Sequence, residues 1–307
     1  MNTDVVRLRA AIAMEEERAG WSASAWFETS AEDAGQAATR AALLVEPSLL
    51  IVAGGDGTIR AVAEEAHGQA TPVALVPQGT GNLLARNLGL LASIEDAVHT
   101  AFAGLNRSID VGRIELTDEA GQVTSHVFLA MTGIGLDAKM ATDTHPGLKK
   151  RIGWLAYAHP ISRSVVRNEQ FVMRYSVDGG RERTVRTHTV IVGNCGTLTA
   201  GLVLLPDAEP DDGLLDVVLL RPRGFWQWVR VGSRLGVGAV LHRSKRGRVM
   251  LRSAPGLRAL QYVQARRMTA RFDQPQTVEI DGDGFGAVVQ VGVALESQPL
   301  SIRVSNL

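Results

Sequence analysis

The chain has 307 residues with 32 basic and 32 acidic side chains, so no net charge would draw it to nucleic acid or to an anionic membrane. Its length suits two domains or one large α/β unit, and we expect two. The single cysteine, Cys195, excludes an internal disulfide and a multi-cysteine zinc site. No apolar run approaches the ~18 residues of a membrane span. We therefore expect a cytoplasmic protein, with membrane contact at most peripheral, at the inner face.

Helices and short buried strands alternate over residues 1–107. Apolar residues recur at three- and four-residue spacing in the helical stretches, and β-branched residues fill the short runs. The predicted helices are Val5–Ala19, Glu32–Leu44, Ile59–Ala66, Asn82–Asn87 and Ile94–Phe102, and the predicted strands are Leu49–Ala53 and Val73–Val76. This alternation predicts an α/β domain with a parallel, Rossmann-like sheet.

Residues 108–307 change to period-two patterning, which predicts a second domain that is an antiparallel β-sandwich. The sequence leaves open that the last residues return to the first domain. Predicted hairpins pair Ser108–Leu116 with Val123–Met131, and Phe171–Val177 with Arg183–Val192. Further strands are expected at Leu214–Leu220, Met268–Phe272, Thr277–Ile280 and Ala287–Val293, and helices at Leu148–Val166 and Phe225–Leu241.

A glycine-rich loop follows the first predicted strand and precedes a helix. It consists of Gly54, Gly55, Asp56, Gly57 and Thr58. Glycines let the backbone approach phosphate oxygens, and the amides of a helix start point at an anion. A carboxylate beside phosphates requires a divalent cation, so Asp56 indicates Mg²⁺. The alternative is a tight turn in which Asp56 caps the helix.

A second loop of this type follows the next strand and contains Gly79, Thr80 and Asn82. Adjacent parallel strands would bring both loops to one edge of the sheet, where Thr80 and Asn82 could bind a nucleotide or substrate. Asn82 could equally be only a helix N-cap.

The two loops together resemble the diacylglycerol kinase catalytic domain and its bacterial and sphingosine kinase-like lipid kinase relatives. Further segments follow in the family's order, namely Thr132–Ala138, Gly193-Asn194, Pro206–Asp216 and Asp281–Asp283. The resemblance implies an ATP- and Mg²⁺-dependent kinase that phosphorylates a hydroxyl of diacylglycerol or a related lipid. It also implies a nucleotide-binding α/β domain joined to a β-sandwich domain.

The resemblance assigns catalytic roles to Asp283, Asp281 and Asp56. In the family the last motif is Asp-Gly-Glu, whose glutamate takes the proton from the lipid hydroxyl, and here Asp283 stands in that place. Its side chain is one methylene shorter, and misplacing a reacting group by about 1 Å can cost ~100-fold in rate. The alternative is a plain hairpin turn, for which Asp-Gly is a common signal.

A structural magnesium site is also implied by the resemblance. It would comprise the carboxylate of Asp212 and the backbone carbonyls of Glu209 and Leu214, an oxygen set that suits a hard cation. A solvated turn is the alternative. Thr29, near the end of an expected second strand, matches a nucleotide contact of the family.

The family's first strand, which ends in Asn-Pro-x-Ser-Gly, has no counterpart in this chain. The resemblance therefore implies either a sheet without that strand and its loop, or a start placed too late.

Residues Arg221–Arg248 contain eight basic residues and no acidic one, with Phe225, Trp226 and Trp228 between them. A basic amphipathic helix with aromatic anchors is typical of contact with an anionic bilayer, where a lipid substrate would be found. The alternative is a helix that packs on the sandwich with its arginines solvated. The sequence predicts no nucleic-acid partner and leaves a homodimer open.

Two other functions remain open. An NAD kinase-like enzyme shares the first glycine loop, although the second loop favours the lipid kinases. A nucleotide- or lipid-binding protein with weakened catalysis would follow from the missing strand and the shortened carboxylate.

Overall fold

The computed structural model describes residues 4–30, 33–135, 170–198, 201–222 and 259–306, with Gln227, Arg230, Val231 and Ser233. The chain forms two compact units. The first unit comprises Met1–Val111 and Glu296–Leu307, and the second unit comprises Gly112–Leu295. The expected boundary between residues 107 and 108 falls inside a strand of the first unit, so the division lies slightly further along the chain.

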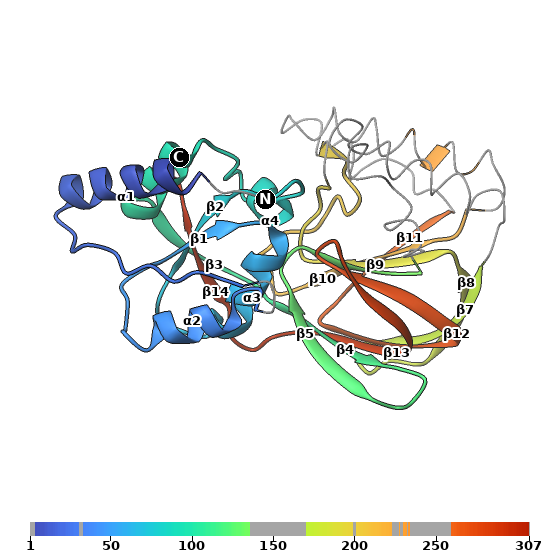
Figure 1. Ribbon diagram of the computed structural model, residues 1–307. Helices are drawn as coiled ribbons and strands as arrows, with labels where there is room; N and C mark the ends of the chain where they lie inside the picture. Colours follow the sequence, from blue (N-terminus) through green and yellow to red (C-terminus); the bar gives the residue numbers. More distant parts are fainter. Residues whose placement is uncertain are drawn as a thin grey trace. The chain divides into compact units, whose positions relative to one another are not determined.

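The first unit contains a four-stranded sheet in the order β1-β2-β14-β3 (Figure 1). Its strands are β1 (Leu50–Gly54), β2 (Val73–Pro77), β14 (Leu300–Val304) and β3 (Leu105–Ile109). β1, β2 and β14 run parallel, whereas β3 is antiparallel to β14. The α/β architecture is confirmed, but the sheet is mixed rather than wholly parallel. The end of the chain supplies one of its inner strands.

Within the described part of the first unit, five helices accompany this sheet. They are α1 (Val5–Ala19), α2 (Gln36–Leu43), α3 (Asp56–Ala66), α4 (Leu83–Asn87) and α5 (Ile94–Ala103). α1 and α5 share one apolar cluster with β2, in which Ile12, Val76 and Val98 are buried. α2 packs against α3 and begins later than the predicted Glu32, because the Asp33 carboxylate accepts hydrogen bonds from the amides of Ala37 and Ala38.

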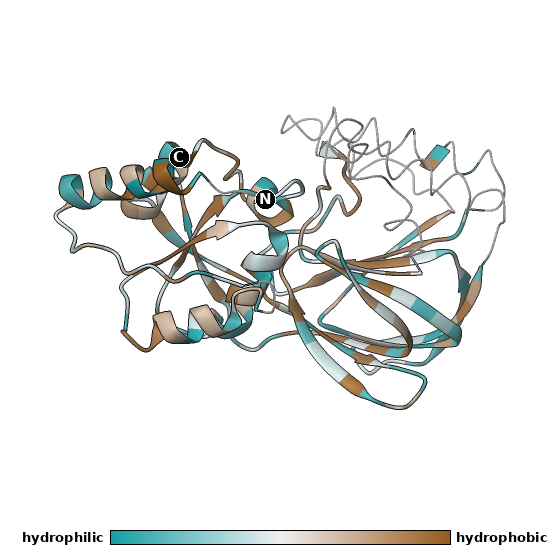
Figure 2. Cartoon of the chain, viewed as in Figure 1, coloured by the Kyte–Doolittle hydropathy of each residue, from teal (hydrophilic) through white to brown (hydrophobic). Residues whose placement is uncertain are grey.

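The second unit contains a ten-stranded antiparallel sheet among its described residues. Hydrophobic and hydrophilic positions alternate along several of its strands (Figure 2), as expected where only one face is buried. The strands are β4 (Gly112–Thr117), β5 (Val123–Phe128), β6 (Met131–Ile134), β7 (Phe171–Val177), β8 (Arg183–Thr187), β9 (Thr189–Gly193), β10 (Leu215–Leu220), β11 (Leu260–Ala265), β12 (Arg267–Ile280) and β13 (Asp283–Leu295).

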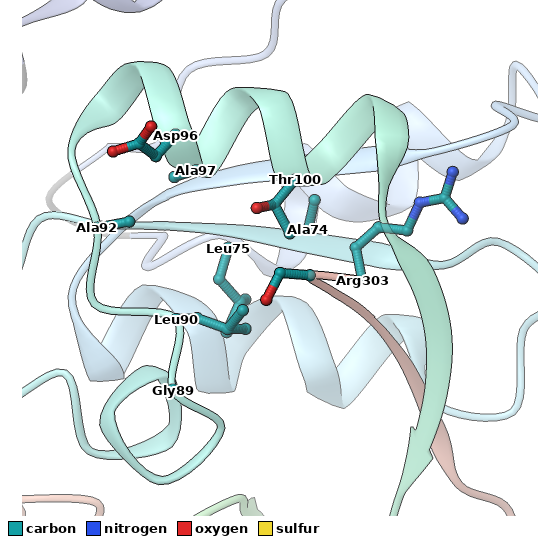
Figure 3. A pocket seen from close by; sticks show the side chains of 10 residues that line it. Ala74, Leu75, Gly89, Leu90, Ala92, Asp96, Ala97, Thr100 and Arg303 are labelled. Atoms are coloured by element: carbon teal, nitrogen blue, oxygen red, sulfur yellow. The ribbon is translucent and has the colours of Figure 1, made fainter. Parts of the chain in front are cut away.

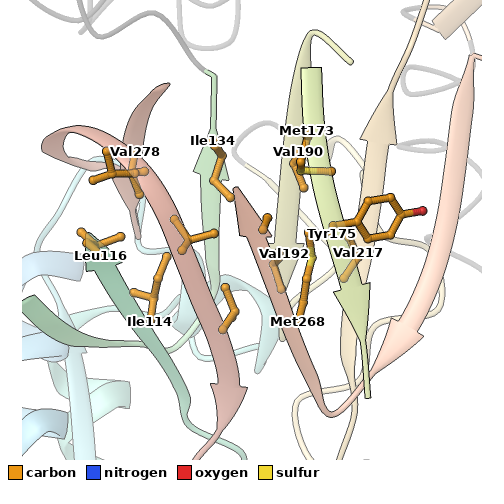
Figure 4. Close-up of a cluster of buried hydrophobic side chains, with 14 of the residues drawn as sticks. Ile114, Leu116, Ile134, Met173, Tyr175, Val190, Val192, Val217, Met268 and Val278 are labelled. Carbon is orange, nitrogen blue, oxygen red and sulfur yellow. The ribbon is translucent and has the colours of Figure 1, made fainter. Parts of the chain in front are cut away.

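Strand β12 is the branch point of this sheet. Its first half pairs with β7 and its second half with β6, while its other edge pairs with β13. The strands on these branches enclose one buried cluster that includes Ile114, Met173, Val217 and Val278 (Figure 4). The predicted β-sandwich is thereby confirmed, and it is built from a single branched sheet.

Several expected boundaries were wrong. The strand predicted at Ser108–Leu116 is split between β3 and β4, which belong to different units. The strands predicted at Met268–Phe272 and Thr277–Ile280 are one strand, β12, with an irregularity in its pairing between them. The expected helix Leu148–Val166 lies outside the described residues, as does most of Phe225–Leu241. None of the helices described is long and apolar enough to cross a membrane.

Candidate functional site

The first glycine loop joins β1 to α3, as the sequence predicts. α3 begins at Asp56, and Gly55 occupies the preceding position without a side chain to cap the helix. A Cβ on Gly54 would lie 2.7 Å from Cβ of Thr58, so only glycine fits there. Because Gly55 has no side chain, the start of α3 carries no side-chain cap, which suits an approaching phosphate.

The second loop leaves β2 and is closed by Asn82. The amide oxygen of Asn82 accepts a hydrogen bond from Gly79 N at 2.8 Å, and its amide nitrogen donates to Gly79 O at 2.8 Å. Asn82 precedes α4 but makes no side-chain capping bond to it, and its backbone lies in the left-handed region with φ 45°. Both ends of the amide thus bind the loop itself, while Thr80 is exposed.

The two loops lie in contact, as expected for adjacent parallel strands. Gln78 N donates to Gly54 O at 2.8 Å. A Cβ on Gly55 would lie 3.3 Å from Cα of Gly79, so the two backbones pass at close range. The carboxylate of Asp56 accepts a hydrogen bond from Leu83 N at 2.6 Å, at the start of α4.

Arg86 is a residue near this site that the sequence analysis passed over. Its side chain folds back from α4, and Nη2 donates to Gly81 O at 3.4 Å. Its Nε is buried and has no hydrogen-bond partner among the described residues. A cation beside a glycine loop is suited to phosphate, and the closeness of Arg86 to the second loop in the sequence is the signal that could have indicated it.

Thr29 lies near Thr58, although its segment is not the expected strand. A Cβ on Gly35, between them, would lie 3.6 Å from Cγ2 of Thr29 and 3.7 Å from Thr58 O. Residues 21–29 form an extended loop without strand pairing. This loop and β1 line a cavity of about 1130 Å³ that both threonines also border.

A smaller cavity of about 210 Å³ lies between β2, α5 and β14 (Figure 3). Asp96, Thr100 and Arg303 are among its lining residues. The guanidinium of Arg303 donates to Ala101 O at 3.0 Å and to Asn106 Oδ1 at 2.9 Å, so it caps the end of α5. This cavity includes no residue of either glycine loop.

In the second unit, Asp281 and Gly282 form a two-residue hairpin turn between β12 and β13, and Asp283 follows the turn. Ile280 pairs with Asp283, and Asp281 and Gly282 have φ values of 48° and 92°. Positive φ at both central residues is the geometry that Asp-Gly favours in tight hairpins. The turn leaves Asp283 exposed at the start of β13.

Asp281 is buried, with 5% of its surface exposed. Oδ1 accepts hydrogen bonds from Ala130 N and Met131 N, and Oδ2 accepts one from Leu129 N, each at 2.9 Å. A carboxylate that satisfies three buried N–H groups is placed to hold the 129–131 segment, not to receive a proton from a substrate. The two carboxylates of the motif therefore stand in very different surroundings.

The predicted metal ligands Asp212, Glu209 and Leu214 lie in the turn before β10. Asp212 Oδ1 accepts a hydrogen bond from Leu214 N at 3.0 Å, which is an Asx turn. Among the described residues, no group of three or more His, Cys, Asp or Glu side chains could hold a metal ion. The structural magnesium site remains a prediction.

The chain matches two family patterns. Residues 6–114 match the diacylglycerol kinase catalytic domain, and residues 130–305, more than half of the chain, match the YegS C-terminal NAD kinase beta sandwich-like domain. The chain belongs to the family of diacylglycerol kinases and YegS-like lipid kinases. This confirms the resemblance drawn from the glycine loops.

Individual members of this lipid kinase family are distant relatives of the chain. The diacylglycerol kinase of Bacillus subtilis (strain 168) is 30% identical over 224 residues, covering 71% of this chain and 69% of that protein. A protein of Pseudomonas syringae pv. tomato named as YegS-like is 28% identical, covering 84% of this chain and 81% of its own length. For the diacylglycerol kinase of Mycobacterium tuberculosis (strain H37Rv), the match is 27% identical and covers 62% of this chain and 60% of that protein.

The fold of the family is also found among solved structures. A crystal structure of a diacylglycerol kinase from Bacillus anthracis str. Sterne superimposes with a TM-score of 0.66 at 17% identity, covering 99% of this chain and 93% of that one. At this identity the match shows the fold alone.

Proposed function

We propose that the chain is an ATP- and Mg²⁺-dependent lipid kinase that transfers the γ-phosphoryl group to a hydroxyl of diacylglycerol or a related lipid. The observation that carries the proposal is the contact between the two glycine loops at the strand ends of the first unit. A glycine loop that leads into a helix offers backbone N–H groups to phosphates, and the start of α3 carries no side-chain cap. The names of the diacylglycerol kinase relatives support the lipid as acceptor.

The nucleotide would be bound by the backbone of Gly54, Gly55 and Gly57 and by the hydroxyls of Thr58, Thr80 and Thr29. Gly79, whose N–H donates to Asn82, would let the second loop approach the first. Arg86 would add a positive charge beside the second loop. Asn82 would act indirectly, because both ends of its amide bind Gly79. We assign it to holding the loop in shape.

Asp283 would serve as general base. It would take the proton from the lipid hydroxyl as that oxygen forms a bond to the γ-phosphorus and the bond to the β-phosphate oxygen breaks, which releases ADP. Asp283 is exposed at a tight turn, whereas Asp281 is buried and accepts three backbone N–H bonds. This contrast favours Asp283 over Asp281 as the base.

Mg²⁺ would neutralise charge on the transferred phosphoryl group. This ion commonly keeps several waters and binds through nucleotide phosphates with one or two protein carboxylates. The described residues hold no preformed cluster for it, so we assign it mainly to the phosphates of ATP.

Transfer of label separates the three candidate functions. Protein is incubated with ATP labelled on its γ-phosphate, together with a lipid extract or with NAD. Label in lipid supports the proposal, and label in NAD would favour the NAD kinase-like alternative. ATP binding without any transfer would favour a nucleotide-binding protein with weakened catalysis.

A further inference from the structure

The carboxylate of Asp56 crosses from the first glycine loop to the second. Its Oδ1 accepts the backbone N–H of Leu83 at 2.6 Å, although the two residues belong to different loops. Leu83 is the first residue of α4, and the first amides of a helix have no acceptor within the helix. Asp56 therefore satisfies from the other loop a donor at the start of α4 that the helix itself leaves without an acceptor.

The residue that would ordinarily cap α4 is used elsewhere. Asn82 precedes the helix, yet its side chain makes no capping bond, and both ends of its amide bind Gly79. With Asn82 engaged in closing the loop, Asp56 supplies a side-chain acceptor to the start of α4. Asn82 thus closes the second loop on itself, and Asp56 binds the loop to the first one.

Gly81, in the second loop, lies next to the Asp56 carboxylate and has no side chain that would obstruct it. A Cβ on Gly81 would lie 2.8 Å from Oδ2 of Asp56, closer than real Cβ contacts come. A side chain at residue 81 would displace the carboxylate from Leu83. Glycine at this position keeps the path of the Asp56 side chain open.

We propose that Asp56 is a positioning residue, which holds the second glycine loop against the first through an acceptor oxygen. This inference rests on the proposed function for its effect on nucleotide binding. It is an alternative to the interpretation of Asp56 as a carboxylate that serves Mg²⁺, and the two interpretations make different predictions for a neutral acceptor. Asparagine retains an oxygen at Oδ1 and loses the charge.

Three variants of the full chain test the proposal. Asp56→Asn keeps the acceptor, Asp56→Ala removes it, and Gly81→Ala displaces it from the other side. We expect the KM for ATP to rise on the order of 10-fold in the Ala variants, because a shift of about 1 Å in a binding group is costly. Asp56→Asn should stay within about 3-fold of the parent, whereas a role that depends on the negative charge beside Mg²⁺ would make it lose affinity as Asp56→Ala does.

Hydrogen exchange at the Leu83 amide gives a readout that needs no activity. Its exchange should be slow in the parent and in Asp56→Asn and about 10-fold faster in both Ala variants. Asp33→Ala, which removes the acceptor for the Ala37 amide at the start of α2, serves as the control that lowers stability without changing exchange at Leu83.

The proposal fails if Asp56→Asn loses ATP binding as fully as Asp56→Ala at an unchanged thermal midpoint, since the charge would then be decisive. It also fails if the Leu83 amide exchanges at the parent rate in Asp56→Ala. If no lipid is phosphorylated but the exchange pattern is as expected, the proposed function falls while the positioning role stands.

Discussion

Gly55 and Gly79 lie backbone against backbone, although they belong to loops that follow different strands. A Cβ on Gly79 would lie 2.8 Å from Cα of Gly55, and a Cβ on Gly55 would lie 3.3 Å from Cα of Gly79. Neither glycine has a positive φ, so this contact, and not backbone strain, is what a side chain would disturb.

Gly79→Ala should therefore damage the site more than Gly55→Ala. The added methyl group at residue 79 also meets Asn82 Oδ1 at 2.6 Å, so we expect a loss of about 1–3 kcal/mol in unfolding free energy and a raised KM for ATP. Gly55→Ala should cost less than about 1 kcal/mol. Denaturant unfolding and ATP titration check both, with Gly292→Ala as a glycine control in the second unit. Equal behaviour of Gly79→Ala and Gly292→Ala would contradict the contact.

Asp281→Ala should unfold the second unit more easily. The change leaves three buried N–H groups without their acceptor and places alanine at φ 48°, so the loss should be about 3 kcal/mol or more. Asp283→Ala, two residues along, should change unfolding free energy by less than about 0.5 kcal/mol because its side chain is exposed. Chemical denaturation of the two variants side by side is the measurement. Similar values would show that Asp281 has no such structural role.

Asp283→Asn should lower the rate of lipid phosphorylation by ~100-fold or more, with little change in the KM for ATP. Asp283→Glu restores the reach of the family's glutamate and should raise the rate if the backbone keeps the family geometry. Turnover at saturating ATP and Mg²⁺ decides the matter. Parent-like turnover in the Asn variant would show that Asp283 is not the general base. Asp281 could not easily take its place, because its carboxylate already accepts three backbone hydrogen bonds.

Asp33 should make stability depend on pH in the acid range. Hydrogen bonds from backbone N–H groups, that of Ala37 first, hold the pKa of the Asp33 carboxyl below its ordinary value. Its contribution is therefore full above the unfolded pKa of about 4 and is lost as pH falls through the lower folded value. The difference in unfolding free energy between the parent and Asp33→Asn should shrink below about pH 4. A difference that is constant from pH 7 to pH 3 would contradict this.

The segment Arg221–Arg248 should promote binding to anionic membranes. Each basic group near such a surface contributes on the order of 1 kcal/mol, and salt screens it. Replacing Arg243, Lys245 and Arg246 by glutamine should weaken sedimentation with phosphatidylglycerol vesicles, while the same change at Arg181, Arg183 and Arg186 should not. Equal binding to neutral and anionic vesicles would refute the electrostatic attraction.

The local signals of the sequence predicted most elements near the glycine loops. A short apolar run, a group of glycines and a helical repeat follow one another in the chain. They predict β1, the first loop and α3 in that order without any information from distant residues. The role of Asn82 could not be predicted, because whether its amide caps α4 or binds Gly79 depends on the geometry of a single turn. The bond from Asp56 to Leu83 depends on the approach of two loops and has no local signal.

Pairing between distant segments explains the other errors. β14 lies between β2 and β3, although it comes from the end of the chain, and this insertion carries β3 into the first unit. The strand-like alternation of residues Ser108–Leu116 is not interrupted in the sequence. It therefore gave no sign that the chain passes from the first unit to the second after Val111. The motif Asp281–Asp283 likewise did not reveal that one carboxylate is buried and the other exposed, because that difference arises from the neighbouring residues 129–131.

Phosphoryl transfer to diacylglycerol tests the central proposal most directly. The purified chain is incubated with γ-labelled ATP, Mg²⁺ and diacylglycerol in mixed micelles, and labelled phosphatidate is counted in parallel with Asp283→Asn and Gly79→Ala. We predict label in phosphatidate from the parent, strongly reduced label from both variants, and none when a chelator removes Mg²⁺. A folded parent that binds ATP and labels neither diacylglycerol nor any lipid of a membrane extract would contradict the proposed function.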